Sequence, residues 1–146
     1  MGTNAFFTRR NATIGIVLFV CVVGALIVAP FFEARRLTID VFDIGQGDSI
    51  LITTPSRERI LVDGGPDATI VAKLFRRLGF FNRTIDLVIP THPQADHITG
   101  LLPVLDRFNV ARVMLSQIRN ETPEYKVLRE KIAAHTLPTL DAGETS

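Results

Sequence analysis

The chain has 146 residues, a hydrophobic fraction of 47% and a formal net charge of +1, which together indicate one domain that is apolar enough to bury a core. This near-neutral charge gives no electrostatic indication of nucleic-acid binding. The single cysteine, Cys21, excludes an internal disulfide and a cysteine-based zinc site.

The first predicted element is a transmembrane helix or signal anchor over residues 13–32, which follows an amino-terminal tail of residues 1–12. No charged residue lies between Arg10 and Glu33, and the segment consists mainly of Ile, Val, Leu, Phe and Ala. About 20 apolar residues suffice to cross the hydrocarbon core of a bilayer. The run is longer than the core of a signal peptide and no small-x-small cleavage site follows it, so we expect an uncleaved single-pass anchor.

The basic residues that flank this segment indicate its orientation. Arg9 and Arg10 precede it without an acidic neighbour, whereas Arg35 and Arg36 follow Glu33. Because positively charged flanks favour the cytoplasmic side, this slight asymmetry predicts that the globular part lies on the outer face of the cell membrane.

Three short strands are predicted next, as an antiparallel meander over residues 37–42, 49–54 and 59–62. Apolar and other residues alternate in the first of them, which predicts one fully apolar face. Gly45 and Gly47 supply the tight turn between the first two strands, since glycine adopts a positive φ without steric cost.

Helices and strands then alternate. We expect a helix from Pro66 to a glycine cap at Gly79, a buried strand over 85–90, a helix over 98–108, a strand over 110–115, a helix from the N-cap Thr122 to about residue 134, and the entry to a further strand over 137–144. This order predicts an α/β (α+β) fold with helices packed on one face of a mixed sheet.

The segment Thr91–His97 is the strongest functional motif. It places His92, Gln94, Asp96 and His97 directly after the buried strand. Imidazole and carboxylate groups suit zinc or a similar divalent ion, and a loop anchored by a strand fixes their geometry. The alternative is a hydrogen-bonded surface pair of histidine and aspartate. His135 stands alone near a predicted helix end, which favours a structural or solvated role.

Two further carboxylates have two interpretations each. Asp63 begins an Asp-Gly-Gly segment after the third strand, where it either forms the turn or supports a metal ligand from the second shell. Asp48 is first a turn residue and second a carboxylate that faces the site. The helix expected just after His97 would point its positive dipole end at an anionic group.

Three blocks in this order resemble the metallo-β-lactamase fold: "DVFDIGQGDSILI" at residues 40–52, "ILVDGGPD" at 60–67 and "THPQADHITG" at 91–100. They are similar to the branch that contains the carboxyl-terminal domain of ComEC-type competence proteins and small membrane-anchored relatives. The resemblance implies that residues 37–146 form the amino-terminal half of an αβ/βα sandwich, truncated at the carboxyl end before the later metal ligands of the family.

The resemblance also implies a ligand set. His92 and position 94 would serve one metal, and Asp96 with His97 would serve a second, with zinc as the expected ion, one or two per site, and manganese or iron as alternatives. This chain has Gln94 where the family pattern has His. An amide oxygen is a poor zinc donor, so the first site is expected to be weakened or absent.

The expected function is that of a membrane-anchored, metal-dependent hydrolase of the metallo-β-lactamase superfamily, although the fragment alone is expected to be inactive. A divalent ion lowers the pKa of water toward about 7, and Asp96 would act catalytically by binding the nucleophile and passing its proton. The ComEC resemblance implies a phosphodiester of DNA as substrate and a role in DNA uptake. The alternative is a non-enzymatic, membrane-tethered binding module with a degenerate metal site. The sequence indicates no oligomeric state.

Overall fold

The computed structural model describes residues 14–25, 36–115 and 122–141. The chain divides into two compact units, residues 1–34 and 35–146. In the first unit, residues 14–25 form a helix whose side chains are mostly exposed. Within the described ranges no helix combines the length and apolarity that a membrane crossing requires. The predicted span over 13–32 is therefore not supported there, and its residues 13 and 26–32, like the tail 1–12, lie outside the described residues.

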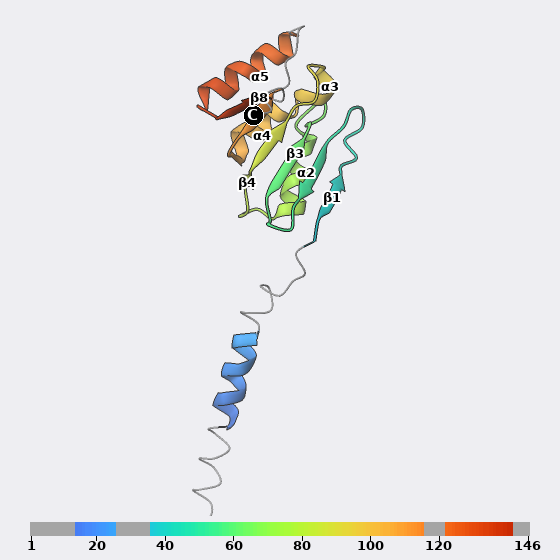
Figure 1. Cartoon of the computed structure of the whole chain (residues 1–146). Helices are drawn as coiled ribbons and strands as arrows, with labels where there is room; N and C mark the ends of the chain where they lie inside the picture. The colour runs from blue at the N-terminus through green and yellow to red at the C-terminus, as the bar shows by residue number, and fades with distance from the viewer. Residues whose placement is uncertain (1–13, 26–35, 116–121, 142–146) are drawn as a thin grey trace, which may run out of the picture. The chain divides into compact units, whose positions relative to one another are not determined.

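The second unit contains a mixed six-stranded sheet, drawn in Figure 1. Its strands, in spatial order, are β1 (Thr38–Val41), β2 (Ile50–Thr53), β3 (Arg59–Val62), β5 (Leu87–Ile89), β7 (Val113–Leu115) and β8 (Thr139–Asp141). The first three pair antiparallel, which confirms the predicted meander, and each later strand runs parallel to its neighbour. A second, two-stranded parallel sheet pairs β4 (Thr84–Ile85) with β6 (Asn109–Val110). The fold is thus mixed α/β, as the alternating pattern predicts.

Four helices connect the strands: α2 (Thr69–Leu78), α3 (Ala95–Ile98), α4 (Leu101–Arg107) and α5 (Pro123–Ala134). The ends of α2 follow local chemistry, because the Asp67 carboxylate accepts a hydrogen bond from the Thr69 N–H and Gly79 ends the helix with φ 81°. At α5, Thr122 Oγ1 accepts the Tyr125 N–H and proline follows at the first helical position. The sequence predicted both of these helices.

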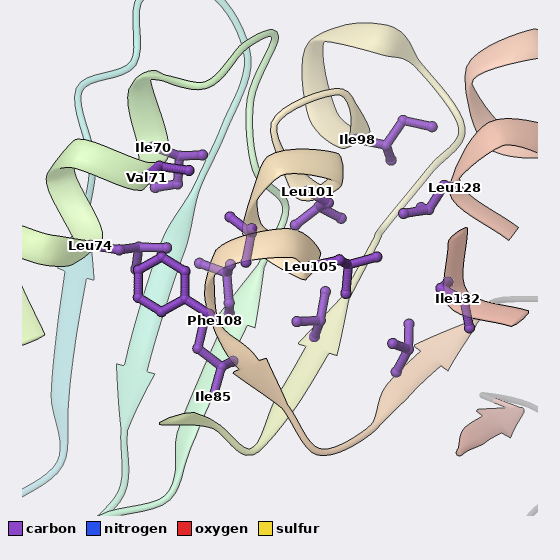
Figure 2. Packing of buried hydrophobic residues seen from close by; sticks show 14 of the residues in the cluster. Ile70, Val71, Leu74, Ile85, Ile98, Leu101, Leu105, Phe108, Leu128 and Ile132 are labelled. Carbon is purple, nitrogen blue, oxygen red and sulfur yellow. The ribbon is translucent and has the colours of Figure 1, made fainter. Parts of the chain in front are cut away.

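The hydrophobic core lies between the helices and one face of the sheet (Figure 2). The strands contribute four nearly inaccessible side chains that the register aligns in one row, namely Leu51, Leu61, Val88 and Val113. The helices contribute apolar side chains at helical spacing: Ile70, Val71, Leu74, Leu101, Val104, Leu105, Leu128 and Ile132. Burial of each such side chain contributes roughly 1.5–3 kcal/mol to the stability of the folded unit. The packed helices and sheet therefore form a stable scaffold for the site.

The opposite face of the sheet is also apolar. Side chains alternate between the two faces of a strand, so the register aligns Ile39, Ile52, Ile60 and Leu87 in a row away from the core. On β1 this apolar face is open, because Ile39 is 61% exposed and Val41 is 71% exposed. The alternation in residues 37–42 correctly predicts one apolar face, and the structure shows that it is the face turned away from the helices.

Three predicted elements are divided in the structure. The expected strand over 85–90 breaks at Asp86, whose N–H donates to the Arg59 carbonyl and whose Oδ2 accepts the Arg59 N–H. The expected strand over 110–115 likewise becomes β6 and β7. The expected helix over 98–108 divides into α3 and α4 around Gly100. The prediction that a helix begins just after His97 is wrong, because His97 lies inside α3.

Thr122 offers a test of how α5 is held to the rest of the unit. Its hydroxyl accepts the Tyr125 N–H and donates to the carbonyl of Pro93, in the loop that carries the histidines. We expect Thr122→Ala to lower the free energy of unfolding by about 1 kcal/mol, since a helix cap is lost. Thr122→Ser, which keeps the hydroxyl, should stay close to wild type in the same denaturant titration. Equal destabilisation by both variants would contradict this role.

Candidate metal centre

The candidate site lies at the carboxyl ends of two parallel strands. Asp63 follows β3, and Thr91 and His92 follow Pro90 at the end of β5. The short helix α3 then brings Asp96 and His97 to the same edge. Parallel strands place their carboxyl ends together, and in open α/β sheets this edge is where ligands bind.

The backbone of Asp63 is held in an uncommon conformation. Its φ is 56°, a left-handed value that aspartate tolerates better than most residues with a Cβ. The Asp63 N–H donates to the Ile89 carbonyl at 3.0 Å, and the Asp63 carbonyl accepts the hydroxyl of buried Ser49 at 3.0 Å. These two bonds fix the residue from β5 and from β2, so that its side chain has one direction available.

The Asp63 carboxylate is buried and accepts three hydrogen bonds. Oδ1 accepts the Thr91 N–H at 2.8 Å, while Oδ2 accepts the Thr91 hydroxyl at 2.6 Å. Oδ2 also lies 3.0 Å from Nδ1 of His97. Both oxygens are therefore engaged, which favours an orienting role for Asp63 behind the site over direct coordination of a metal.

These contacts determine which ring nitrogens are free. An ionised Asp63 accepts hydrogen bonds only, so Nδ1 of His97 is the donor, and in the neutral ring Nε2 is then the atom with the lone pair. The Thr91 hydroxyl donates to Asp63, so Nδ1 of His92, 2.7 Å from Thr91 Oγ1, must act as the donor to that oxygen. Nε2 of His92 then retains its lone pair as well, and both imidazoles have the tautomer that coordinates a metal through Nε2.

The two imidazole rings and the Asp96 carboxylate lie close together. The rings of His92 and His97 have centroids 3.7 Å apart, and Oδ2 of Asp96 lies 3.9 Å from Nε2 of His97. Asp63, His92 and His97 can each place one potential ligand atom within 4.8 Å of the others, and of these three the two histidines are the ones that the hydrogen bonds to Asp63 leave available for a metal. Two imidazoles, each held by a hydrogen bond at Nδ1, and the half-buried carboxylate of Asp96 next to His97 form a donor set that fits a divalent ion such as zinc.

The other predicted site residues have less defined positions. Gln94 is exposed and precedes α3 as its N-cap residue, without a side-chain cap bond. Asp48 is exposed and directly follows Gly47 at the end of the glycine turn. His135 ends α5 away from the cluster, with Nε2 3.6 Å from Oδ1 of Asp106. Its position fits the structural role that the sequence favours.

Close backbone contacts hold the segment Thr91–His97, which we call the metal loop, against the sheet. A Cβ atom on Gly47 would collide with the carbonyl oxygen of Asp96, and one on Gly100 would collide with the carbonyl of Gly64. The Gly64 N–H donates to the His97 carbonyl at 2.7 Å, and the Gly100 N–H donates to the Gly65 carbonyl at 2.8 Å. Glycine at these positions lets the backbone segments approach closely enough to fix α3 over the end of β3.

Comparison with known proteins identifies the family. The model of the metallo-beta-lactamase superfamily matches residues 42–136, which is more than half of the chain. The chain therefore belongs to the metallo-beta-lactamase superfamily, whose members are generally hydrolases that bind divalent metals, often zinc. No curated protein matches the chain significantly.

Solved structures of this superfamily are similar to part of the chain. A metallo-beta-lactamase from Cronobacter sakazakii, a variant of its HARLDQ motif, is 27% identical with a TM-score of 0.45, covering 54% of this chain and 31% of its own. A subclass B3 metallo-beta-lactamase from a soil metagenome is 26% identical with a TM-score of 0.44, covering 53% and 29%. A diphosphatase of the PhnP family is 23% identical with a TM-score of 0.41, covering 64% and 36%. The match thus spans about a third of the length of each structure.

Thr91 is the residue of the site to which the sequence assigned no role. It contributes an N–H and a hydroxyl to Asp63 and an acceptor to His92, so it connects the buried carboxylate to the first histidine. The sequence feature that could have indicated this role is the position of Thr91, a hydroxyl residue directly between the proline that closes a buried strand and the first histidine of the motif. Its partner, Asp63, lies 28 residues earlier, and only the pairing of β3 with β5 brings the two together.

Replacement of Asp63 tests the orienting role. Asp63→Asn keeps a residue type that tolerates the left-handed backbone but removes the negative charge that holds the Nδ1 proton of His97. We expect zinc affinity to fall about 10- to 100-fold in a titration of the metal-free chain, as for other lost partners of ligating histidines. Asp48→Asn is the matched control and should change the affinity little. Similar losses in both variants would instead make Asp48 a residue of the site.

Proposed function

We propose that this chain forms part of the active centre of a membrane-anchored, metal-dependent hydrolase. The observation that supports this function is the pair of adjacent histidines whose Nδ1 atoms are both engaged, with Nε2 of His97 3.9 Å from Oδ2 of Asp96. His92, Asp96 and His97 are the proposed ligands, while Asp63 and Thr91 orient them. The family resemblance implies further ligands in addition to these three.

The residues on this chain would act in three ways. A divalent ion held here would supply Lewis acidity, which makes water a nucleophile near neutral pH. Asp96, half-buried beside His97, would accept a hydrogen bond from the attacking water, take its proton and later return it to the leaving group. Asp63, with both oxygens occupied, would hold the His97 ring in one orientation, with Nδ1 directed at the carboxylate, throughout.

The proposed substrate is a phosphodiester, with the DNA backbone as the specific candidate. Support for this class comes from the resemblance to the carboxyl-terminal domain of ComEC-type proteins, which implies a role in DNA uptake. The net charge of +1 does not add to it. The second candidate function is a binding module without hydrolysis, and the specific observation that favours it is Gln94 at the position of a family histidine.

Restoration of the histidine distinguishes these two functions. Gln94 is exposed, so Gln94→His can be accommodated without repacking. In the complete protein we expect this variant to bind more zinc per chain and to hydrolyse bis(p-nitrophenyl) phosphate faster, by about tenfold or more for a restored zinc ligand. The control is Ala95→His, which adds the same ring at the exposed neighbouring position and should change neither quantity.

Each possible result of the Gln94→His experiment leads to a different conclusion. Hydrolysis by the wild type that increases in Gln94→His supports an enzyme with a weakened first site. Zinc bound by both proteins without hydrolysis by either would replace the enzyme with a binding module. Two zinc ions per wild-type chain would show that Gln94 does not weaken the site.

We also propose a location, a single membrane span over residues 13–32 with the globular unit on the outer face of the cell membrane. It is supported by the absence of charged residues between Arg10 and Glu33 and by the basic residues before them. An external protease should then degrade the globular unit in intact cells, with a cytoplasmic protein as the control that stays protected. Degradation only after cell breakage would reverse the orientation, and recovery of the chain in the soluble fraction would remove the anchor.

A further inference from the structure

The edge of the sheet opposite the metal centre carries two exposed phenylalanines. Phe81 is 98% exposed and Phe80 is 61% exposed, in the loop between α2 and β4. Single exposed apolar side chains are common on protein surfaces. Two large exposed apolar side chains that touch each other are less common and more often mark an interaction surface. Their rings contact each other edge to face, with centroids 5.8 Å apart.

The loop holds these rings in place. Arg59 Nη1 donates to Asn82 Oδ1 at 2.6 Å and to the Thr84 carbonyl at 3.1 Å, which ties the loop to the start of β3. Arg83 Nε donates to the Phe80 carbonyl, and its guanidinium lies 4.6 Å from the centroid of the Phe80 ring. Phe80 also stacks on Phe75 at 5.5 Å. Phe81 therefore projects outward from an ordered turn, so its insertion into a partner would cost little ordering.

The segment that carries the rings, between Asp67 and Asp86, is rich in basic residues. Residues 68–85 contain four basic residues and no acidic residue, the basic ones being Lys73, Arg76, Arg77 and Arg83. Arg77 is paired with Asp40 at 2.7 Å, whereas Arg76 is exposed at the end of α2. We call this surface, formed by Phe80, Phe81 and the four basic residues, the aromatic–basic edge. Exposed aromatic rings with adjacent arginines fit a surface that is apolar inside and negatively charged outside.

The topology places this edge beside the start of β1. Strands β1 and β3 run in the same direction, since each is antiparallel to β2, and β5 runs parallel to β3. The start of β1 and the loop before β4 thus lie at one edge of the sheet, away from α3 (Figure 1). Six peptide steps separate Phe32, the end of the proposed span, from Thr38 at the start of β1.

We propose that the aromatic–basic edge binds the surface of a lipid bilayer that contains acidic headgroups, with Phe81 inserted and Arg76 and Arg83 at the phosphates. This inference rests on the proposed membrane location and extends it from the anchor to the globular unit. Insertion at this edge would direct the metal centre, at the opposite edge of the sheet, away from the membrane and toward a substrate in the aqueous phase.

The sequence contains no tryptophan, so one substitution provides a local reporter. The full chain carrying Phe81→Trp is reconstituted into vesicles of phosphatidylcholine, with and without phosphatidylglycerol. We expect its emission to shift to shorter wavelength, and to be quenched by brominated lipid, when phosphatidylglycerol is present. The control is Val127→Trp, on an exposed position of α5, whose emission should not change.

A charge variant tests the electrostatic part. In the Phe81→Trp background, Arg76→Glu should lower the inserted fraction about fivefold or more, because one basic residue near an acidic surface contributes about that factor. Lys126→Glu, an equal charge change at an exposed position of α5, should have little effect.

Each remaining outcome has a definite meaning. Flotation of the chain with vesicles, without a Phe81→Trp shift, would keep the anchor and overturn the lipid contact of the edge. A shift that occurs without vesicles and increases with protein concentration would assign the edge to a second copy of the chain and likewise overturn the proposal. Flotation and shift that are both abolished by high salt would remove the anchor but leave the edge as a peripheral lipid-binding surface.

Discussion

The hydrogen bonds to the Asp63 carboxylate are the interaction on which the metal centre depends. One buried carboxylate receives the N–H and hydroxyl of Thr91 and the Nδ1 proton of His97, and through Thr91 it also determines the proton position on His92. A buried charge is costly unless every lone pair is satisfied, and here the groups that satisfy it are the ones that must be oriented. The requirement of Asp63 for donors and the requirement of the histidines for fixed tautomers are met by the same bonds.

The sheet makes this arrangement possible. The parallel pairing of β3 with β5 brings Asp63 beside Thr91, and the antiparallel pairing with β2 supplies the Ser49 hydroxyl to the backbone of Asp63. Because Gly47 and Gly100 have no side chain, the metal loop can pack closely against these strand ends. Main-chain contacts of the core therefore place Asp63 and the segment Thr91–His97 together, and the side chains of Asp63 and Thr91 then orient the histidines.

Much of the fold follows from local chemistry that is visible in the sequence. The meander, the cap at Gly79 and the start of α5 at Thr122 each depend on residues within one turn, and the structure has all three. The metal motif was visible because its four polar groups lie within six residues. The breaks at Asp86 and Gly100 were not predicted, because each depends on a partner distant in sequence, Arg59 in one case and Gly64 with Gly65 in the other. The role of Thr91 was missed for the same reason.

The edge strand β1 has a consequence for the solution behaviour of the globular unit. Among the described residues no strand pairs with the outer side of β1, so its free N–H and C=O groups form a template for strand addition. An added strand would also bury part of the exposed Ile39 and Val41 side chains, which favours the addition. Two features oppose this, namely the length of only four residues and the charge of Asp40, which Arg77 draws toward the helix side. The ion pair of Asp40 with Arg77 at the same time ties β1 to α2, so the strand with the open edge is held to the rest of the unit from its helix side.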